Sequence, residues 1–302
     1  HVYGNLIANW SLFNCVTQVL VPRFRVDEIF DLLEKIGEVT YFPAVPTMLT
    51  ALYNNPRIHE VDLGRRIHVI NTGAAPCPVE LIEKLRDMNV FITEAWGMTE
   101  STSLRVVNPI LGKKKPGSIG LPAPDNDIRI VDMTDGKTEV PRGEPGEMLL
   151  KGPSVMKEYW NNPRETAEQL VDGWLHTGDV VVQDEDGFLF IVDRKKDMII
   201  AGGFNIYPRE IDEVLSRHPK IEEAITLGIE DPYRGETVKA FIVPKRGETI
   251  TAEEIILFCK ERLAPYKVPK EIEFRAELPK SAVGKILRKI LRDEELRKRS
   301  TN

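Results

Sequence analysis

The stretch VDEIFDLLEKIGEVTYFP, residues 26–43, decides the fold class because a helical period is followed at once by a strand-like run. The apolar positions of its first part share one helical face: Ile29, Leu32, Leu33 and Ile36. The closing VTYFP is a short apolar run typical of a β-strand. A helix followed directly by a strand is one unit of an alternating α/β fold.

The same alternation continues along the chain to about Thr99. Helices are predicted at 46–54 and 78–88, each starting with proline, and strands at 67–73 and 89–93. Repeated alternation of this kind predicts a parallel sheet covered by helices. Ligands collect beyond the carboxyl ends of the strands in such sheets, so we expect functional residues there.

Two loops fall at those strand ends. TGAAP, residues 72–76, follows one predicted strand, and EAWGMTE, residues 94–100, follows the next and ends in a turn. The small residues of the first loop would let the backbone approach a flat base closely. In the second, the Thr99 hydroxyl suits a phosphate oxygen, and the Glu100 carboxylate suits Mg²⁺, which prefers oxygen ligands.

The later segments change in character. Short β-like runs punctuated by Gly, Pro and Asp predict an antiparallel β-rich subdomain over 117–193. Helices and strands alternate again over 197–302, which predicts a small α+β domain. The full expectation is therefore an α/β subdomain at 1–116, the β-rich subdomain completing a large domain at 1–193, and a mobile C-terminal domain after a hinge at 194–196.

Three local expectations accompany this division. The apolar run at 5–21 is predicted to form a buried helix leading into a strand. The charged segment DRKKD, residues 193–197, is predicted to be an exposed joint between domains. The segment 284–299 is predicted to be a basic amphipathic helix, and its basic residues other than Lys285 are interpreted as a solvated face.

Composition excludes several classes of function. The 302 residues carry a formal net charge of −6, whereas binding along nucleic acid requires a basic face. The three cysteines, Cys15, Cys77 and Cys259, are scattered and lack CxxC spacing. This pattern argues against a disulfide framework or a structural zinc site and favours a reducing, cytoplasmic compartment.

Further candidate ligand groups lie in the later segments. Asp179 ends the run GWLHTGD, and its two carboxylate oxygens could accept both hydroxyls of a ribose. Arg194 follows a strand and could contact ribose or phosphate. Lys285 is a mobile point charge suited to a developing phosphate anion. Taken singly, each has an ordinary structural explanation, because such residues commonly cap helices or form turns.

Their order along the chain resembles the adenylate-forming superfamily, which includes acyl-CoA synthetases, aryl-CoA ligases, luciferases and peptide-synthetase adenylation domains. The resemblance covers essentially the whole chain. The matching segments are 73–76, 96–100, 174–179, 194–199 and 279–285. The segment DRKKDMIIAGGFNIYPREI, residues 193–211, is most similar to the fatty acyl-CoA synthetase branch.

The resemblance implies a role for each matching residue. The ATP or AMP contacts are Gly73, Ala74, Ala75, Pro76, Ala95, Trp96, Gly97, Met98, Thr99, Asp179, Ile191, Arg194 and Lys285. The catalytic residues among them are Lys285 and Thr99, together with Glu100 as the Mg²⁺ ligand. The acyl pocket is lined by His1, Trp96 and Gly97, the CoA path by Gly202, Gly203 and Phe204, and the hinge is Lys196. A simple strand-end turn explains Gly202 and Gly203 equally well.

The implied activity is that of an ATP-dependent fatty acid–CoA ligase that uses Mg²⁺, with fatty acid and CoA as its partners. Rotation of the small domain about Lys196 would separate adenylation from thioester formation. The family's phosphate loop would lie upstream of His1, so we expect a part of a longer enzyme that adenylates poorly alone. Acyl chain length and oligomeric state stay open. Apolar substrates are compatible with peripheral membrane contact.

Two alternatives stay open beside the ligase. The first keeps adenylation but passes the acyl group to a carrier protein, or to oxygen as in luciferases. Ile200 stands where luciferases place a lysine, which disfavours the oxygen route. The second is a catalytically incomplete fragment that only binds nucleotide or a partner.

Overall fold

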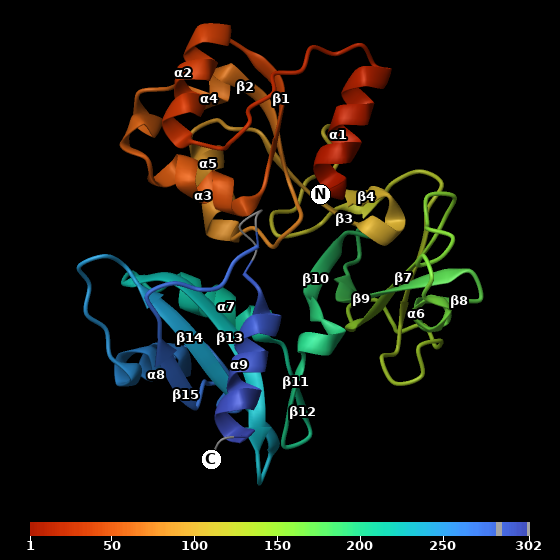
Figure 1. Ribbon diagram of the computed structural model, residues 1–302, viewed down its shortest axis with the longest axis vertical. Coiled ribbons are helices and arrows are strands. Elements are labelled where there is room, and N and C mark those ends of the chain that lie inside the picture. The colour runs from red at the N-terminus through yellow and green to blue at the C-terminus, as the bar shows by residue number, and fades with distance from the viewer. Residues whose placement is uncertain (282–285, 301–302) are drawn as a thin grey trace. The chain divides into compact units, whose positions relative to one another are not determined.

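The computed structural model describes residues 1–281 and 286–300 (Figure 1). The chain divides into two compact units. The first consists of residues 1–177 and 181–191, and the second of 178–180 and 192–302. The division at 191/192 lies two residues before the predicted hinge segment, and the hinge itself stays a prediction.

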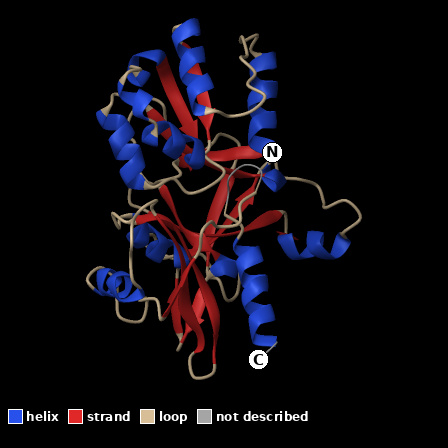
Figure 2. Ribbon diagram, turned by 60° about the vertical axis from the view of Figure 1, so that its left-hand side comes forward, coloured by secondary structure: helices blue, strands red, loops and turns tan. Residues whose placement is uncertain are grey.

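The first unit begins with the predicted alternation of helices and strands. Its elements are α1 (Val2–Phe13), α2 (Val26–Ile36), β1 (Val39–Ala44), α3 (Pro46–Asn54), α4 (Leu63–Arg66), β2 (Ile67–Thr72), α5 (Val79–Asp87), β3 (Ile92–Met98), β4 (Ser103–Val107) and β5 (Leu121–Pro122). Figure 2 shows the helices packed around the strands of this sheet. Buried side chains from α2, α3 and α5, such as Phe30, Leu49 and Ile82, form one core with Ile70 of β2.

The first sheet is parallel only in part. Its order is β1-β2-β3-β4-β5, with β1, β2 and β3 parallel and β4 and β5 antiparallel to their neighbours. The parallel part confirms the predicted α/β subdomain. The antiparallel part differs from it, because β3 continues to Met98 and pairs there with β4. The residues Glu94–Met98, which we expected beyond the strand end, therefore belong to the strand.

The β-rich subdomain is built on a second sheet. Its strands are β6 (Asp127–Val131), β7 (Gly146–Lys151), β8 (Leu170–Val171), β9 (Trp174–Gln183) and β10 (Leu189–Arg194), and its helix is α6 (Pro163–Gln169). The order is β10-β9-β7-β6, and β8 pairs with β9. The pairs β6/β7 and β8/β9 are antiparallel, as predicted. Strands β9 and β10 carry the chain between the two units.

The second unit is the predicted α+β domain. Its elements are β11 (Ile199–Ala201), β12 (Phe204–Ile206), α7 (Pro208–Ser216), β13 (Ile221–Asp231), β14 (Gly235–Pro244), α8 (Ala252–Lys260), β15 (Glu271–Phe274) and α9 (Arg288–Ser300). The strand order is β12-β11-β14-β13, with β15 parallel to β14. Figure 1 shows β13 and β14 side by side.

Alternation along β14 gives the second unit two cores. Val238, Ala240 and Ile242 pack in one cluster with side chains of α7 and α8. Phe241 packs in another cluster with Leu291 of α9. Successive side chains of a strand point to opposite faces, so the core side chains of α9 lie on the opposite face of β14 from those of α7 and α8.

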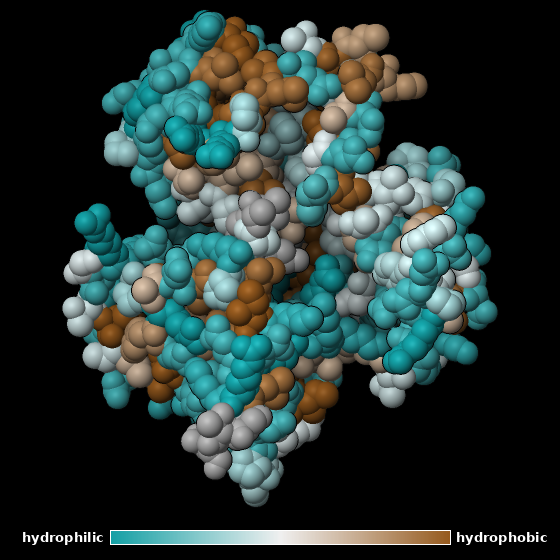
Figure 3. All heavy atoms as spheres, viewed as in Figure 1, coloured by the Kyte–Doolittle hydropathy of each residue, from teal (hydrophilic) through white to brown (hydrophobic). Residues whose placement is uncertain are grey.

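The prediction for residues 5–21 is wrong in two respects. Helix α1 is mostly exposed, with Leu12 and Phe13 at 69% and 89% exposure, and residues 16–21 form no strand. Figure 3 shows apolar atoms over the far end of α1. Only Tyr3 and Ser11 are buried in α1, because the helix contacts the rest of the unit along one narrow face. No helix within the described residues combines the length and apolarity needed to cross a bilayer.

Candidate nucleotide site

A bulge in β3 shapes the segment predicted to hold the nucleotide. The register between β3 and β4 shifts between Trp96 and Gly97. A Cβ atom at Gly97 would lie 1.9 Å from the carbonyl oxygen of Ser103. Only glycine allows the two backbones to approach this closely, and the bulge re-aims the strand end.

The turn after β3 is fixed by hydrogen bonds of one serine. Ser101 Oγ accepts from the backbone N–H of Met98 at 3.1 Å and donates to the carbonyl of Ser103 at 3.0 Å. Thr102 has φ of 56° and Ser103 has φ of 79°, left-handed values that non-glycine residues adopt rarely. This constrained turn leaves Thr99 exposed and Glu100 half-buried, so both side chains stand at the surface of the first unit.

Glu100 is held by a residue that sequence analysis missed. The Tyr159 hydroxyl donates to Glu100 Oε1 at 2.9 Å, and the backbone N–H of Met156 donates to the Glu100 carbonyl at 2.7 Å. Burial raises the pKa of Tyr159, and the hydrogen bond to Glu100 raises it further. The phenol therefore stays protonated and fixes one carboxylate oxygen. Tyr159 lies 59 residues away in an irregular segment, where periodicity carries no signal.

The predicted adenine loop meets β3 directly. Gly73 follows β2, and a Cβ atom there would lie 2.9 Å from the carbonyl oxygen of Ala95. Ala74 has φ of 68°, and Pro76 is exposed while Ala75 is half-buried. The structure therefore brings the 73–76 loop against the strand that carries the other predicted nucleotide contacts.

Three more predicted nucleotide contacts share one apolar cluster. Trp96 is 6% exposed, and Met98 and Ile191 pack against the cluster to which it belongs. The Trp96 indole is thus a buried part of this apolar cluster. Segments about 95 residues apart in sequence meet here, and their contacts with a nucleotide stay predictions.

His1 begins α1, far from these residues in sequence. Its Nδ1 atom accepts from the backbone N–H of Tyr3 at 3.2 Å and so caps the helix. The Tyr3 hydroxyl donates to Asn71 Oδ1 at 2.8 Å, and the Asn71 amide donates to Thr93 Oγ1 at 2.9 Å. This buried chain of hydrogen bonds fixes the start of α1 against β2 and β3.

In the second unit, the structure brings Asp179 and Arg194 together. Arg194 Nε lies 2.6 Å from Asp179 Oδ1, and the Asp179 side chain is 3% exposed. The predicted ribose contacts are thus an ion pair of neighbouring strands rather than two separate side chains. Such a pair orients the carboxylate in advance of ligand binding.

The predicted exposed joint at 193–197 is partly wrong. Asp193 is 5% exposed, and its two oxygens accept from the backbone N–H groups of Arg194 at 2.7 Å and Arg209 at 2.8 Å. Burial raises the pKa of Asp193, while Arg288 opposes that shift. Lys196, the predicted hinge residue, is exposed in a short 3₁₀ turn.

The solvated-face interpretation of α9 is wrong for its first residue. The Arg288 side chain is 17% exposed and forms ion pairs with Asp193, Asp197 and Asp212. These carboxylates come from the end of β10, the 3₁₀ turn and α7. Sequence periodicity could not identify them, because each lies at least 76 residues away.

Gly202 and Gly203 form the connection between β11 and β12. Their φ values are 59° and 83°, and Ala201 pairs with Phe204 across them. Two consecutive left-handed residues make the tight hairpin turn that glycine favours. Phe204 stacks on Tyr266 with ring centroids 4.5 Å apart. The CoA contacts assigned to this hairpin stay predictions.

Lys285 lies outside the described residues. The residues that flank it are described, and Lys280 and Ile286 form an isolated antiparallel bridge. The backbone N–H of Leu287 donates to the carbonyl of Pro279 at 2.8 Å. The two ends of this part of the chain are therefore held together.

The Glu100 carboxylate fits the role of a magnesium ligand. No group of three or more His, Cys, Asp or Glu side chains within the described residues converges into a metal site. Mg²⁺ does not require one, since it is usually bound through one or two carboxylates together with substrate phosphates and water. Glu100, anchored by Tyr159 at one oxygen, matches that sparse coordination.

Comparisons with known proteins agree with this geometry. Residues 1–160 match the AMP-binding enzyme family, and residues 210–285 match the AMP-binding enzyme C-terminal domain. The chain belongs to the AMP-binding enzyme family. The chain is 47% identical to a long-chain-fatty-acid–CoA ligase of Bacillus subtilis over 98% of the chain and 52% of the relative. It spans about half the length of the curated relatives it matches.

Solved structures support the same assignment. ATP-bound MatB from Rhodopseudomonas palustris matches with a TM-score of 0.90 and 32% identity, over 97% of this chain and 58% of that one. O-succinylbenzoate coenzyme A synthetase (MenE) from Bacillus subtilis, in complex with ATP and magnesium ion, matches with a TM-score of 0.85 and 36% identity. That match covers 97% of this chain and 59% of MenE.

Proposed function

We propose that this AMP-binding enzyme forms part of an ATP-dependent fatty acid–CoA ligase. The observation that carries the proposal is the constrained turn at 97–103, which holds Thr99 and the Tyr159-anchored Glu100 at the end of β3. The 47% identity to a long-chain-fatty-acid–CoA ligase supports the substrate class. The ATP-bound relatives support ATP as the activating substrate.

The reaction has two steps with a shared acyl group. A carboxylate oxygen of the fatty acid attacks the α-phosphorus of ATP, and pyrophosphate leaves to give the acyl-AMP mixed anhydride. The thiolate of CoA then attacks the acyl carbonyl carbon, and AMP leaves to give the thioester. Activation is needed because a carboxylate is a poor electrophile.

The residues of the first unit would act on the first step. Thr99 would donate to an oxygen of the α-phosphate, where negative charge increases in the transition state. Glu100 would hold Mg²⁺, which when bound neutralises charge on the phosphates. Loss of one such preorganised contact typically costs on the order of 10²–10³ in rate. Gly73 to Pro76 would lie along the adenine, where a small backbone loop leaves room for the base.

The second unit would supply three further contacts. The Asp179–Arg194 pair would bind the ribose hydroxyls through the carboxylate. Lys285 would stabilise the carboxylate and α-phosphate during adenylation. The hairpin at Gly202 and Gly203 would line the path of the pantetheine, since its residues present no side chain. Lys196 would act as the hinge between the two steps.

Product analysis tests the function directly. The reading frame is extended upstream of His1 to the length of the curated relatives, and the protein is incubated with ATP, Mg²⁺, CoA and carboxylic acids of graded length. Mass spectrometry should detect acyl-CoA within a defined range of chain lengths. Accumulation of acyl-AMP without thioester would indicate that the acyl acceptor is a carrier protein and not CoA. Absence of any adenylate would leave only a nucleotide-binding role.

Separate half-reactions test the role of Lys285 in the same protein. Lys285→Ala should reduce acyl-AMP formation by about 10² or more, because the variant lacks the positive charge that stabilises the transition state. Thioester formation from supplied acyl-AMP should be unchanged. Lys289→Ala, which removes an exposed lysine of α9, should leave both rates near wild type. Equal loss of both half-reactions in Lys285→Ala would refute the role.

A further inference from the structure

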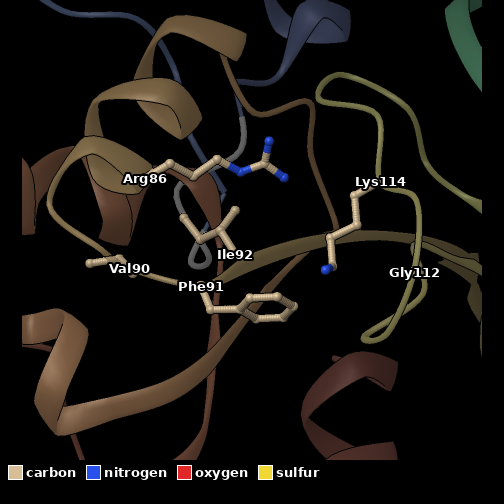
Figure 4. A pocket seen from close by; sticks show the side chains of 6 residues that line it. All are labelled: Arg86, Val90, Phe91, Ile92, Gly112 and Lys114. Carbon is tan, nitrogen blue, oxygen red and sulfur yellow. The ribbon is translucent and has the colours of Figure 1, made fainter.

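A hollow of about 350 Å³ lies at the beginning of β3, within the first unit (Figure 4). It is lined by Arg86, Val90, Phe91, Ile92, Gly112 and Lys114. No residue proposed for the nucleotide, acyl or CoA contacts lines it. The hollow has a size typical of small-ligand pockets, which begin at roughly 300 Å³.

Two cations face the hollow from different elements. Arg86 belongs to the last turn of α5, and Lys114 to the loop that follows β4. Figure 4 shows both side chains turned toward the space above Phe91. Both residues are half-buried, and neither has a carboxylate ion-pair partner among the described residues. A partly desolvated positive charge without a counter-charge is unfavourable, so an anion placed there would be stabilised.

The loop around Lys114 is anchored on both sides. Lys113 forms an ion pair with Asp186, and Lys115 forms ion pairs with Asp184 and Asp186. Lys113 and Lys115 also hold the pKa of Asp186 at about 2, well below its usual range. These contacts turn the flanking lysines to the two aspartates. Lys114 instead extends over Phe91, with Nζ 4.4 Å from the ring centroid.

The chemistry of the lining selects the ligand. An arginine guanidinium binds phosphate through two parallel hydrogen bonds, and a lysine ammonium adds a compact point charge. Val90 and Ile92 are each 2% exposed, so the ring of Phe91 is the main apolar surface of the hollow. We infer that this hollow binds the phosphate group of a small phosphorylated molecule, with Arg86 and Lys114 as its two cationic contacts.

Pyridoxal 5′-phosphate is a probe that reports on both cations. Its aldehyde condenses with the amine of Lys114 to form an imine and water, while its phosphate would lie against Arg86. Borohydride then transfers hydride to the imine carbon and leaves a stable secondary amine. Peptide mass spectrometry of the labelled chain identifies the modified lysine, so labelling at Lys114 is separated from labelling at the proposed catalytic Lys285.

The expected result is a preference that depends on phosphate. Lys114 should be labelled several times faster by pyridoxal 5′-phosphate than by pyridoxal, and inorganic phosphate should protect it. Arg86→Gln should remove most of that preference, as expected for loss of one charge-assisted contact. Arg86→Lys, which keeps the charge, should restore part of the preference. This partial rescue also shows that the altered position is compatible with folding.

Matched controls use basic residues elsewhere in the first unit. Arg65→Gln, at an exposed position of α4, should leave the Lys114 preference unchanged. Lys35, exposed on α2, gives the baseline preference, because pyridoxal closes to an internal hemiacetal and so labels any lysine more slowly than its phosphate does. A preference at Lys114 that equals the Lys35 baseline, or an excess over that baseline that survives Arg86→Gln, would overturn the inference. Neither result depends on ligase activity.

Discussion

Nη1 of Arg288, in the first turn of α9, lies 3.5 Å from Oδ1 of Asp193 at the end of β10. The other terminal nitrogen of Arg288 pairs with Asp212 of α7. Arg292, one turn further along α9, reaches Asp197 at 3.0 Å. These pairs bind the segment 193–197 to the helix that follows Lys285. Within the second unit, one ion-pair network therefore connects the segment that contains the proposed hinge to α9.

Removing the central cation should destabilise the second unit strongly. Arg288→Met leaves Asp193 and Asp212 buried without their cation, a situation that typically costs about 3–5 kcal/mol. Urea unfolding followed by circular dichroism should show this loss in the free energy of unfolding. Lys289→Met, at the next and exposed position of α9, should change it by less than about 0.5 kcal/mol. Similar losses in both variants would contradict the buried network.

The stability of the second unit should depend on the protonation of Asp212. Burial raises the pKa of Asp212 to about 6, against an unfolded value near 3.9, and Arg288 only partly opposes this. The folded state holds the Asp212 proton to higher pH than the unfolded state does. Protonated Asp212 therefore contributes to stability below about pH 4, and this contribution is lost as pH rises through 6.

The variant Asp212→Asn cannot ionise and isolates that effect. Between pH 4 and 7, the free energy of unfolding of the wild type should fall relative to the variant by about 2 kcal/mol. Glu213→Gln, on the exposed side of α7, should show a much smaller relative change. A constant difference between wild type and Asp212→Asn across this range would show that Asp212 is already ionised at pH 4.

A methyl group at the β3 bulge should be poorly tolerated. Gly97→Ala would place Cβ 1.9 Å from the Ser103 carbonyl oxygen, so backbone must move, at a cost of about 3 kcal/mol in stability. Gly4→Ala is the matched control, because a Cβ there meets nothing within 4 Å and the residue lies in α1. That change should be neutral or stabilising by up to about 1 kcal/mol. Thermal unfolding of both variants makes the comparison.

The hairpin prediction can be tested with an almost identical glycine. Gly203 and Gly247 both have φ of 83°, and neither would bring a Cβ within 4 Å of another residue. Gly203→Leu and Gly247→Leu should therefore lose similar stability, about 1 kcal/mol. In the upstream-extended protein, only Gly203→Leu should slow thioester formation, and acyl-AMP formation should be unaffected in both. An unchanged thioester rate in Gly203→Leu would remove the hairpin from the CoA path.

Local periodicity predicted the regular elements well. Helices α3 and α5 appear within one residue of their expected bounds, 46–54 and 78–88, because each has a proline at its start. The glycine-rich hairpin and the short strands of the second sheet also follow from local turn chemistry. Resemblance located the 73–76 loop and the Trp96 strand, which the structure places in contact.

The features that sequence missed depend on partners far along the chain. Strand β3 extends through Met98 only because β4 returns beside it, which no pattern within 94–98 encodes. Tyr159 acquires its role from Glu100, and Arg288 becomes buried through three distant aspartates. Conversely, residues 16–21 have the apolar composition of a strand and no described strand to pair with. Tertiary context decided each of these cases.

The antiparallel pairing of β13 with β14 also bears on the order of events during folding. The ladder runs from Ile221 opposite Pro244 to Asp231 opposite Gly235, so only three residues close its turn. Hairpins of this kind form in about 1–10 μs. The parallel pair β1 and β2 must instead wait for the closure of a crossover that contains α3 and α4. The second unit is synthesised after most of the first, yet we expect its β13/β14 hairpin to form sooner after its own synthesis than the β1/β2 pair does.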